Sequence, residues 1–216
     1  MPALDLAQLR VVAITDRTLL GDDPAHAFAR ALDGVRPGSV AIQVRAKDLD
    51  GGALLSLAKL AVATGVPVLV NDRVDVALAA GACGVHLPEA GLLVDDVHRR
   101  WPSLAVGVSR HDPADVARAL ADPHVRLVHV GPLNATPGKT AVGTAVLREI
   151  VKPHGARPVA VAVAVLVGVG GIQTADDARA AIAAGCDAVA MIRAAWSGGS
   201  LARMVEAIDQ QLAIRA

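Results

Sequence analysis

Short runs of aliphatic residues recur along the whole chain, roughly 20 to 30 residues apart. They occupy residues 11–16, 39–45, 66–72, 84–88, 105–110, 126–131, 158–169 and 188–193. Most are almost continuously apolar, which is typical of strands buried on both faces of a parallel sheet. The segments between them have helical spacing, and several begin with Asp or Thr and end with Gly. The pattern therefore predicts a repeated unit of one strand followed by one helix.

The repeats predict an α/β fold, a single (β/α)8 TIM barrel that spans residues 1–216 as one domain. A doubly wound open sheet is the alternative, because a strand count does not prove closure. The positions of the polar residues favour the barrel, since a closed barrel gathers the C-terminal ends of all strands around one mouth. The residues at those ends are Asp16, Gln43, Arg45, Lys47, Asn71, Asp72, His86, Ser109, Gly131, Gly170 and Gly171.

Composition excludes several classes of partner. Lys plus Arg and Asp plus Glu both number 21, so no net field attracts nucleic acid or an acidic membrane, and aromatic residues make up only 1%. Cys83 and Cys186 are too far apart for a zinc knuckle or a disulfide framework and are expected to be buried free thiols. The N-terminus does not resemble a signal peptide, and the apolar stretch at 158–172 is too short for a membrane span. We expect a cytoplasmic protein with small-molecule ligands, and homo-oligomerisation stays open.

The segment "IQVRAKD" places Gln43, Arg45 and Lys47 two residues apart. On an extended segment this spacing points all three side chains to the same side. Two cations and an amide at a strand end are costly unless an anion or a carboxylate meets them. We predict a clamp for phosphate or pyrophosphate, with Arg45 as a bidentate donor and Lys47 as a point charge. A solvated loop, or salt bridges to neighbouring helices, is the alternative.

Two glycine-containing segments are further candidates for phosphate binding. In "LVGVGGIQTADDA", Gly170 and Gly171 separate a predicted strand from a helix that begins after Thr174, and a helix N-terminus favours an anion. The Gly pair could instead serve only a tight turn. The segment "GPLNATPGKTA" is rich in turn formers and predicts a lid that closes on an anion through Thr136 and Lys139. The same composition is also typical of a plain surface loop.

Polar residues that could hold a metal or move a proton follow other strands. Asn71 and Asp72 end a predicted strand and could together hold a metal ion. Three histidines, His86, His111 and His129, lie in or just after strands, but none has the spacing of a zinc site. Their part in function is left open, and the other histidines are expected to be ordinary surface residues.

Seven segments in order resemble the thiamine phosphate synthase and thiazole tautomerase superfamily: "ITD", "IQVRAKD", "VNDRVDVALAAGACGVHLP", "GVSRHD", "VGPLNATPGK", "GVGGI" and "AVAMIRAA". The resemblance covers about residues 11–196. It implies a (β/α)8 barrel and an enzyme of thiamine biosynthesis. The synthase branch is a transferase that couples hydroxymethylpyrimidine pyrophosphate with thiazole phosphate and releases pyrophosphate.

The resemblance also implies roles for individual residues. Catalytic groups around the leaving pyrophosphate would be Arg45, Lys47, Ser109 and Lys139. Substrate would be bound by Gln43, Asn71, Thr136, Gly170, Gly171 and Arg193, and Mg²⁺ by Asp72.

The metal site departs from the synthase pattern. A second Asp that binds Mg²⁺ is expected where this chain has Gly91. Because Mg²⁺ often binds through one or two carboxylates plus water and substrate phosphates, Asp72 alone would give a weaker site. Glu89 is the nearest carboxylate that could substitute.

Other departures concern the lid, the last strand and the seventh strand. The lid has one hydroxyl fewer than the family pattern, Arg193 stands where the family has Ser, and the run at 158–169 is longer than the family's seventh strand. The tautomerase branch needs no metal, but its catalytic His is expected where this chain has Pro132. We predict a thiamine phosphate synthase-like enzyme, with a thiazole tautomerase-like isomerase or a non-catalytic phosphate-binding barrel as alternatives.

Overall fold

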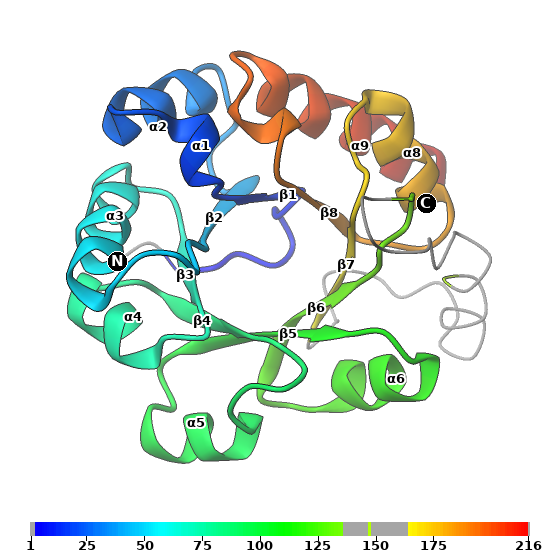
Figure 1. The fold of residues 1–216 in the computed structure, drawn as a ribbon. Coiled ribbons are helices and arrows are strands. Elements are labelled where there is room, and N and C mark those ends of the chain that lie inside the picture. Colours follow the sequence, from blue (N-terminus) through cyan, green and yellow to red (C-terminus); the bar gives the residue numbers. More distant parts are fainter. Residues whose placement is uncertain (1–2, 136–146, 148–163, 216) are drawn as a thin grey trace.

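The computed structural model describes residues 3–135, 147 and 164–215. Its parallel strands form a closed barrel in which each strand pairs with its neighbours in chain order and β1 pairs with β8 (Figure 1). The strands are β1 (Val11–Ile14), β2 (Val40–Val44), β3 (Val68–Asn71), β4 (Gly84–Leu87), β5 (Ala105–Arg110), β6 (Val125–Val130), β7 (Val165–Val169) and β8 (Ala188–Met191). The predicted barrel is confirmed, and the open sheet is excluded.

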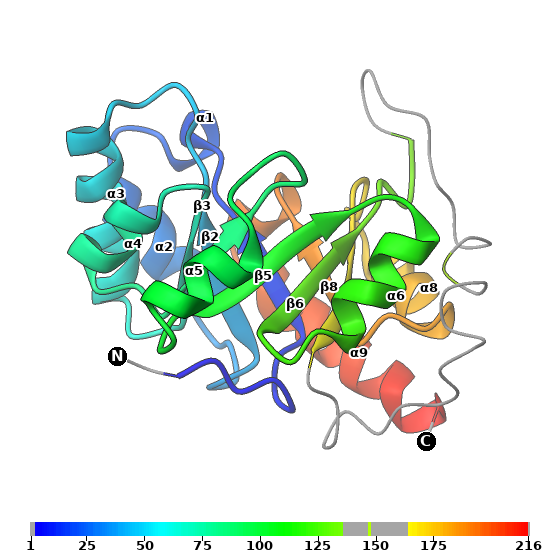
Figure 2. The ribbon, with the colours of Figure 1, turned by 90° about the horizontal axis from the view of Figure 1, so that it is seen from below.

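Helices surround the barrel, so each strand has one face toward the helices and one toward the barrel axis (Figures 1 and 2). They are α1 (Arg17–Leu20), α2 (Pro24–Leu32), α3 (Gly51–Ala63), α4 (Val74–Ala80), α5 (Val94–Arg100), α6 (Pro113–Ala121), α8 (Ala175–Ala183) and α9 (Ser200–Arg215), with the 3-10 turn η3 (Ala194–Trp196). Of the connection between β6 and β7, the structure describes residues 131–135, Leu147 and Ala164. Within the described ranges, no helix combines the length and the apolar character needed to cross a bilayer.

The strands are apolar on both faces because their side chains alternate between two separate cores. On β1, Val11 and Ala13 pack in the layer between barrel and helices. Val12 and Ile14 belong instead to the core inside the barrel. Burial on both sides explains why the strand runs of the sequence show almost no polar alternation.

Several helix starts follow the predicted Asp and Thr caps. Asp23 and Asp112 each accept a backbone N–H from the first turn of the helix that follows, and Asp50, which was not predicted, does the same at α3. At α8, Thr174 and Asp177 form a reciprocal capping box. These caps mark where their helices begin, whereas α4 and α5 begin without a side-chain cap.

Both cysteines are free thiols, as predicted. Cys186 is buried, whereas Cys83 is only partly buried, so the expectation of two buried thiols holds for Cys186 alone. Desolvation raises the pKa of both thiols, and the Asp187 carboxylate adds to the rise at Cys186. Neither group is a ready nucleophile at neutral pH.

Candidate active site at the mouth of the barrel

Five consecutive strands carry polar side chains near their C-terminal ends, on the face that points into the barrel. The residues two positions earlier on three of these strands, Ala41, Leu69 and Leu127, belong to the interior core. Alternation along a strand therefore turns the polar residues to the same side. They are Gln43 on β2, Asn71 on β3, His86 on β4, Ser109 on β5 and His129 on β6. This polar layer lies between the aliphatic interior and the mouth.

The polar layer is largely buried and partly hydrogen-bonded. Gln43 is only 3% exposed, and its Nε2 donates to Oδ1 of Asn71 at 3.2 Å. In the described part of the chain, three buried polar atoms of this layer find no hydrogen-bond partner: Oε1 of Gln43, Nδ1 of His86 and Nε2 of His129. Such atoms are rare in protein interiors, and each calls for an explanation.

Two imidazoles meet inside the barrel. The rings of His86 and His129 have centroids 4.2 Å apart and planes inclined by 41°. Nε2 of His86 lies 2.8 Å from Oγ of Ser109. Desolvation lowers the pKa of His129 to about 3. Desolvation, followed by the neighbouring His129 and Arg110, also lowers the pKa of His86 well below its ordinary value, so both rings are neutral at pH 7.

Asp72 follows β3 in a left-handed backbone conformation, with φ of 63°. Its N–H donates to the carbonyl oxygen of His86 at 2.9 Å, which ties this turn to β4. The residue is exposed, and the neighbouring Arg73 pairs with Asp75 at 2.6 Å rather than with Asp72. A positive φ is uncommon for a non-glycine residue, although Asp tolerates it better than most, and such positions cluster at functional sites.

Gly91, where the second metal carboxylate is expected, lies beside Asp72. A Cβ placed on Gly91 would be 3.1 Å from Oδ1 of Asp72 and 2.8 Å from Cδ of Pro88. Glu89 is not directed to this place by its contacts, because its Oε2 lies 2.9 Å from Nδ1 of His111. Among the described residues, no group of three or more His, Cys, Asp or Glu side chains is arranged to hold a metal ion.

Arg45 and Lys47 lie in the loop that follows β2, and both are exposed. Oγ1 of Thr15 accepts the N–H of Arg45 at 2.8 Å and donates to the carbonyl oxygen of Arg45 at 3.0 Å, which fixes the backbone there. Lys47 is in a turn, so the expectation that an extended backbone aligns it with Gln43 is wrong. The predicted alternative, salt bridges to neighbouring helices, is not found for either cation within the described ranges.

Gly170 and Gly171 follow β7, with φ of 95° and 70°. A Cβ on Gly170 would come within 2.5 Å of Cβ of Pro132, and one on Gly171 within 2.5 Å of Cβ of Asn134. Nδ2 of Asn134 also donates to the carbonyl oxygen of Gly171 at 3.0 Å. The loops after β6 and β7 are therefore packed on each other. This packing alone requires glycine at both positions, whether or not a phosphate binds there.

The structure says less about the remaining predicted site residues. Arg193 lies just after β8 and is exposed. Thr136 and Lys139 of the predicted lid lie outside the described residues, as do residues 158–163 of the long apolar run.

Comparison with known proteins identifies the family of this chain. Residues 11–195 match the model of the family described as thiamine monophosphate synthase. The chain belongs to this family. A thiamine-phosphate synthase of Deinococcus radiodurans is 36% identical over 226 residues, covering 99% of this chain and 76% of that protein. One from Anaeromyxobacter dehalogenans is 39% identical over 206 residues, covering 90% and 87%.

The solved structures agree with the sequence relatives. Thiamine phosphate pyrophosphorylase from Pyrococcus furiosus matches with a TM-score of 0.76 and 25% identity, covering 97% of this chain and 98% of that one. Membership of the thiamine monophosphate synthase family confirms the predicted family, the barrel fold and an enzyme of thiamine biosynthesis in the transferase class. The roles of individual residues are not tested by these likenesses and stay predictions.

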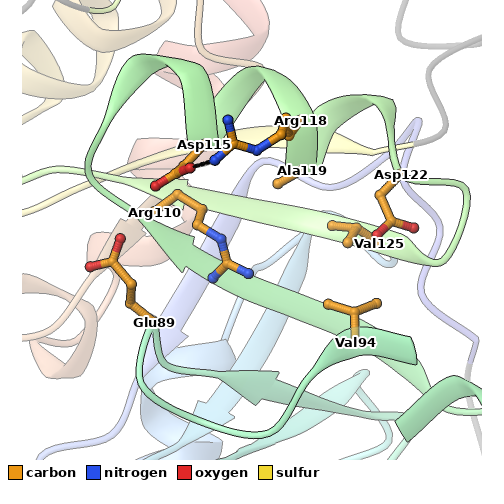
Figure 3. A pocket seen from close by; sticks show the side chains of 8 residues that line it. All are labelled: Glu89, Val94, Arg110, Asp115, Arg118, Ala119, Asp122 and Val125. Atoms are coloured by element: carbon orange, nitrogen blue, oxygen red, sulfur yellow. Dashed lines mark hydrogen bonds and ion pairs between the residues drawn. The ribbon is translucent and has the colours of Figure 1, made fainter. Parts of the chain in front are cut away.

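A surface cavity of about 350 Å³ lies apart from the polar layer of this family member (Figure 3). Arg110, the last residue of β5, contributes to it, while the preceding Ser109 points into the barrel. Arg118 pairs with Asp115 across its rim. The cavity is lined by Glu89, Val94, Arg110, Asp115, Arg118, Ala119, Asp122 and Val125, on the outer side of β5 and β6 next to α5 and α6. Apart from Glu89, the carboxylate considered as a substitute metal ligand, none of the predicted site residues lines it.

Sequence reasoning left the functions of His86 and His129 open and did not predict that the two rings touch. A signal was available, because each occupies an inward position two residues from the end of its strand run. Asn134 was missed as well, although it stands in a segment recognised as rich in turn formers. Its contact with Gly171 depends on how two distant loops pack, which no local pattern encodes.

Proposed function

We propose that this chain is a thiamine-phosphate synthase that joins hydroxymethylpyrimidine pyrophosphate to a thiazole phosphate and releases pyrophosphate. One observation supports this most strongly. Arg45 and Lys47 are exposed cations without ion-pair partners among the described residues, and they follow the strand that carries the buried Gln43 into the polar layer. Unpaired cations beside fixed polar groups suit a leaving group that carries several negative charges.

The reaction breaks the C–O bond between the pyrimidine methylene and pyrophosphate and forms a C–N bond to the thiazole nitrogen. Pyrophosphate departs with the bonding electron pair, and the nitrogen lone pair captures the methylene cation. Neither step requires a proton transfer, so the site has to neutralise charge and to align two substrates. Neutral, buried His86 and His129 are consistent with a site that does little acid–base work.

The proposed roles combine the family resemblance with the positions of those side chains that the structure describes. Arg45 would bind the pyrophosphate through two parallel donors, and Lys47 would add a point charge. The Ser109 hydroxyl would donate to the leaving group from the inner wall. Gln43 and Asn71, which bond to each other, would support the same anion. The thiazole phosphate would be met by Gly170, Gly171 and Arg193, with Thr136 and Lys139 closing over the pyrophosphate.

Asp72 fits a Mg²⁺ ion by the chemistry of its donor atoms. Its exposed carboxylate supplies the hard oxygen ligands that Mg²⁺ takes, and water and substrate phosphates complete such sites. Gly91 itself adds no side chain beside Oδ1 of Asp72, where a Cβ would lie 3.1 Å from that oxygen. When bound, the ion supplies further charge neutralisation for the pyrophosphate. Asp72 would hold it, while Arg45 and Lys47 bind the remaining phosphate oxygens.

Pyrophosphate release by the purified full chain tests the proposal. We expect release that requires both substrates and Mg²⁺, and we expect Asp72→Asn to raise the Mg²⁺ concentration needed. Asp75→Asn is the matched control, because that nearby carboxylate is already paired with Arg73. No release at saturating Mg²⁺, together with isomerisation of the non-aromatic thiazole tautomer, would assign the chain to the tautomerase alternative. Binding of a thiazole phosphate with neither activity would indicate a non-catalytic barrel.

The cytoplasmic location belongs to the proposal as well, and it rests on the character of the sequence. Homo-oligomerisation stays open, and size-exclusion chromatography with light scattering of the purified chain measures the number of chains directly.

A further inference from the structure

His129 lies outside every role assigned so far, yet it is buried to 3% exposure at the level of the site. On β6 it stands in register with Ser109 of β5, and on the other side of β5 His86 stands in register with Gly107. Gly107 has no side chain, and a Cβ there would come within 2.8 Å of Nδ1 of His86. The missing side chain on β5 thus allows the rings of β4 and β6 to meet at 4.2 Å.

The contacts of His86 indicate which nitrogen carries the proton. Nε2 has a partner, Oγ of Ser109 at 2.8 Å, whereas Nδ1 is buried and has none among the described residues. A buried N–H without an acceptor is rarer than a buried acceptor without a donor. The neutral ring therefore keeps its proton on Nε2, which donates to Oγ of Ser109. The hydroxyl proton of Ser109 then remains available for another acceptor.

We propose that His129 is a positioning residue: its ring packs against His86 and holds it so that Nε2 donates to Ser109, which leaves the Ser109 hydroxyl to donate to an anionic substrate group at the mouth. Without the His129 ring, the imidazole of His86 has space to turn, and water reaches its Nδ1 atom. The second half of this inference rests on the proposed role of Ser109 toward pyrophosphate. The first half concerns only the two imidazoles and can be tested without substrate.

Nitrogen-detected NMR of the histidine rings in the full-length chain tests the first half. In the unmodified protein, we expect His86 to show a protonated Nε2 and to keep that signal from pH 8 to pH 5. In His129→Ala, we expect His86 to titrate within this range and to show both tautomers. His129→Phe keeps a ring against His86, so it should restore the unmodified behaviour. His26→Ala, which removes an exposed histidine of α2, is the control.

The kinetics of pyrophosphate release test the second half. For His129→Ala we expect kcat/KM to fall about tenfold, the effect of one misdirected hydrogen bond, with an acid limb that the unmodified enzyme lacks. His129→Phe should stay close to the unmodified value and lack that limb. A merely structural role would lower the thermal midpoint of His129→Ala without changing its pH profile, and that outcome would overturn the proposal, as would an unchanged His86 signal. If the alanine variant does not fold, His129→Asn replaces it in both measurements.

The proposed function and the positioning role of His129 can be refuted independently of each other. Unmodified protein that releases no pyrophosphate would contradict the proposed function, while the NMR comparison would still decide whether His129 positions His86. Conversely, active enzyme with an unaltered His86 in the alanine variant would refute only the positioning role.

Discussion

The inner wall of the barrel has two unlike parts. Strands β7, β8 and β1 line it with aliphatic side chains alone, including Val167, Ala190 and Val12, which form one continuous cluster. Strands β2 to β6 also begin with aliphatic or glycine positions, but toward the mouth each carries a polar side chain, from Gln43 to His129. The aliphatic part is a packed core. Among the described strands, the polar part carries the inward-facing side chains that can donate or accept a hydrogen bond.

The polar part is costly for folding. Leaving a buried donor or acceptor without a partner costs about 1–3 kcal/mol per group. Among the described residues, three such atoms lie in this wall and belong to Gln43, His86 and His129. Aliphatic replacements would remove that cost, so the polar part is best explained by what it does at the mouth. The comparison therefore predicts that changes in the two parts will separate activity from stability.

Removing charge at the mouth should have the largest effect. We expect Arg45→Ala to lower kcat/KM for pyrophosphate release about 10²- to 10³-fold, as the loss of a preorganised donor to developing charge does. The free energy of unfolding should change by no more than about 0.5 kcal/mol, because Arg45 is exposed. Steady-state kinetics and urea titration measure the two quantities. Arg99→Ala, on α5 and paired with Asp96, is the matched control and should change neither.

The buried imidazoles should make the polar part sensitive to acid. The pKa of His129 is about 3 in the folded chain, so below the unfolded value near 6.5 the unfolded state binds more protons. Stability is therefore fully present above pH 6.5 and is lost as the pH falls toward 3, by about 1.4 kcal/mol per pH unit for this ring. His86 adds to the loss in the same direction.

Urea unfolding at a series of pH values between 7 and 4.5 measures this slope. His129→Phe should make it shallower by the contribution of one ring, since phenylalanine cannot take up a proton. His26→Phe on the exposed face of α2 should keep the slope of the unmodified chain. Equal slopes in all three proteins would show that the two imidazoles do not determine the acid response.

A cavity in the aliphatic part should lower the stability of the protein and leave its activity unchanged. Val167 on β7 is fully buried, so Val167→Ala should lower the free energy of unfolding by about 2 kcal/mol through lost burial and the void that remains. At temperatures where the variant is folded, kcat/KM should stay close to the unmodified value. Leu78→Ala, an exposed leucine of α4, controls for loss of a surface apolar group. A fall in kcat/KM as large as that of Arg45→Ala would remove the distinction between the two parts.

Sequence patterns predicted the barrel because its elements are locally encoded. Each strand is an apolar run, and caps such as Asp112 and Thr174 mark the helix starts. The inward direction of Gln43 and Ser109 follows from strand alternation. The alternation of side-chain direction holds only within a strand, however. Because β2 ends at Val44, Lys47 lies in a turn, which the sequence pattern did not predict.

The contacts between neighbouring strands and loops could not be predicted in the same way. The meeting of His86 and His129 depends on the register of β4, β5 and β6 and on the absence of a side chain at Gly107. The place of Gly91 beside Asp72 likewise depends on a turn after β4 that returns toward β3. A motif comparison indicated that a carboxylate was missing, and only the structure shows which atom it would face.

The smallest expected effect comes from supplying that carboxylate. Gly91 has an ordinary backbone conformation, so an L side chain is allowed there once the ring of Pro88, whose Cδ would lie only 2.8 Å from the new Cβ, moves away. We expect Gly91→Asp to lower the Mg²⁺ concentration for half-maximal pyrophosphate release about tenfold, because a second carboxylate beside Asp72 strengthens a hard-cation site. Gly91→Asn has the same shape without the charge and should leave the requirement unchanged.

Binding of Mn²⁺, followed by its electron paramagnetic resonance signal, gives a readout that does not depend on turnover. The Asp variant should bind Mn²⁺ more tightly than the unmodified chain, and the double change Gly91→Asp with Asp72→Asn should lose that gain because the second ligand has no partner. Equal affinity in the Asp and Asn variants would mean that the two positions do not share a cation. In that case the polar part would act on pyrophosphate through Arg45, Lys47 and Ser109, with the metal held elsewhere.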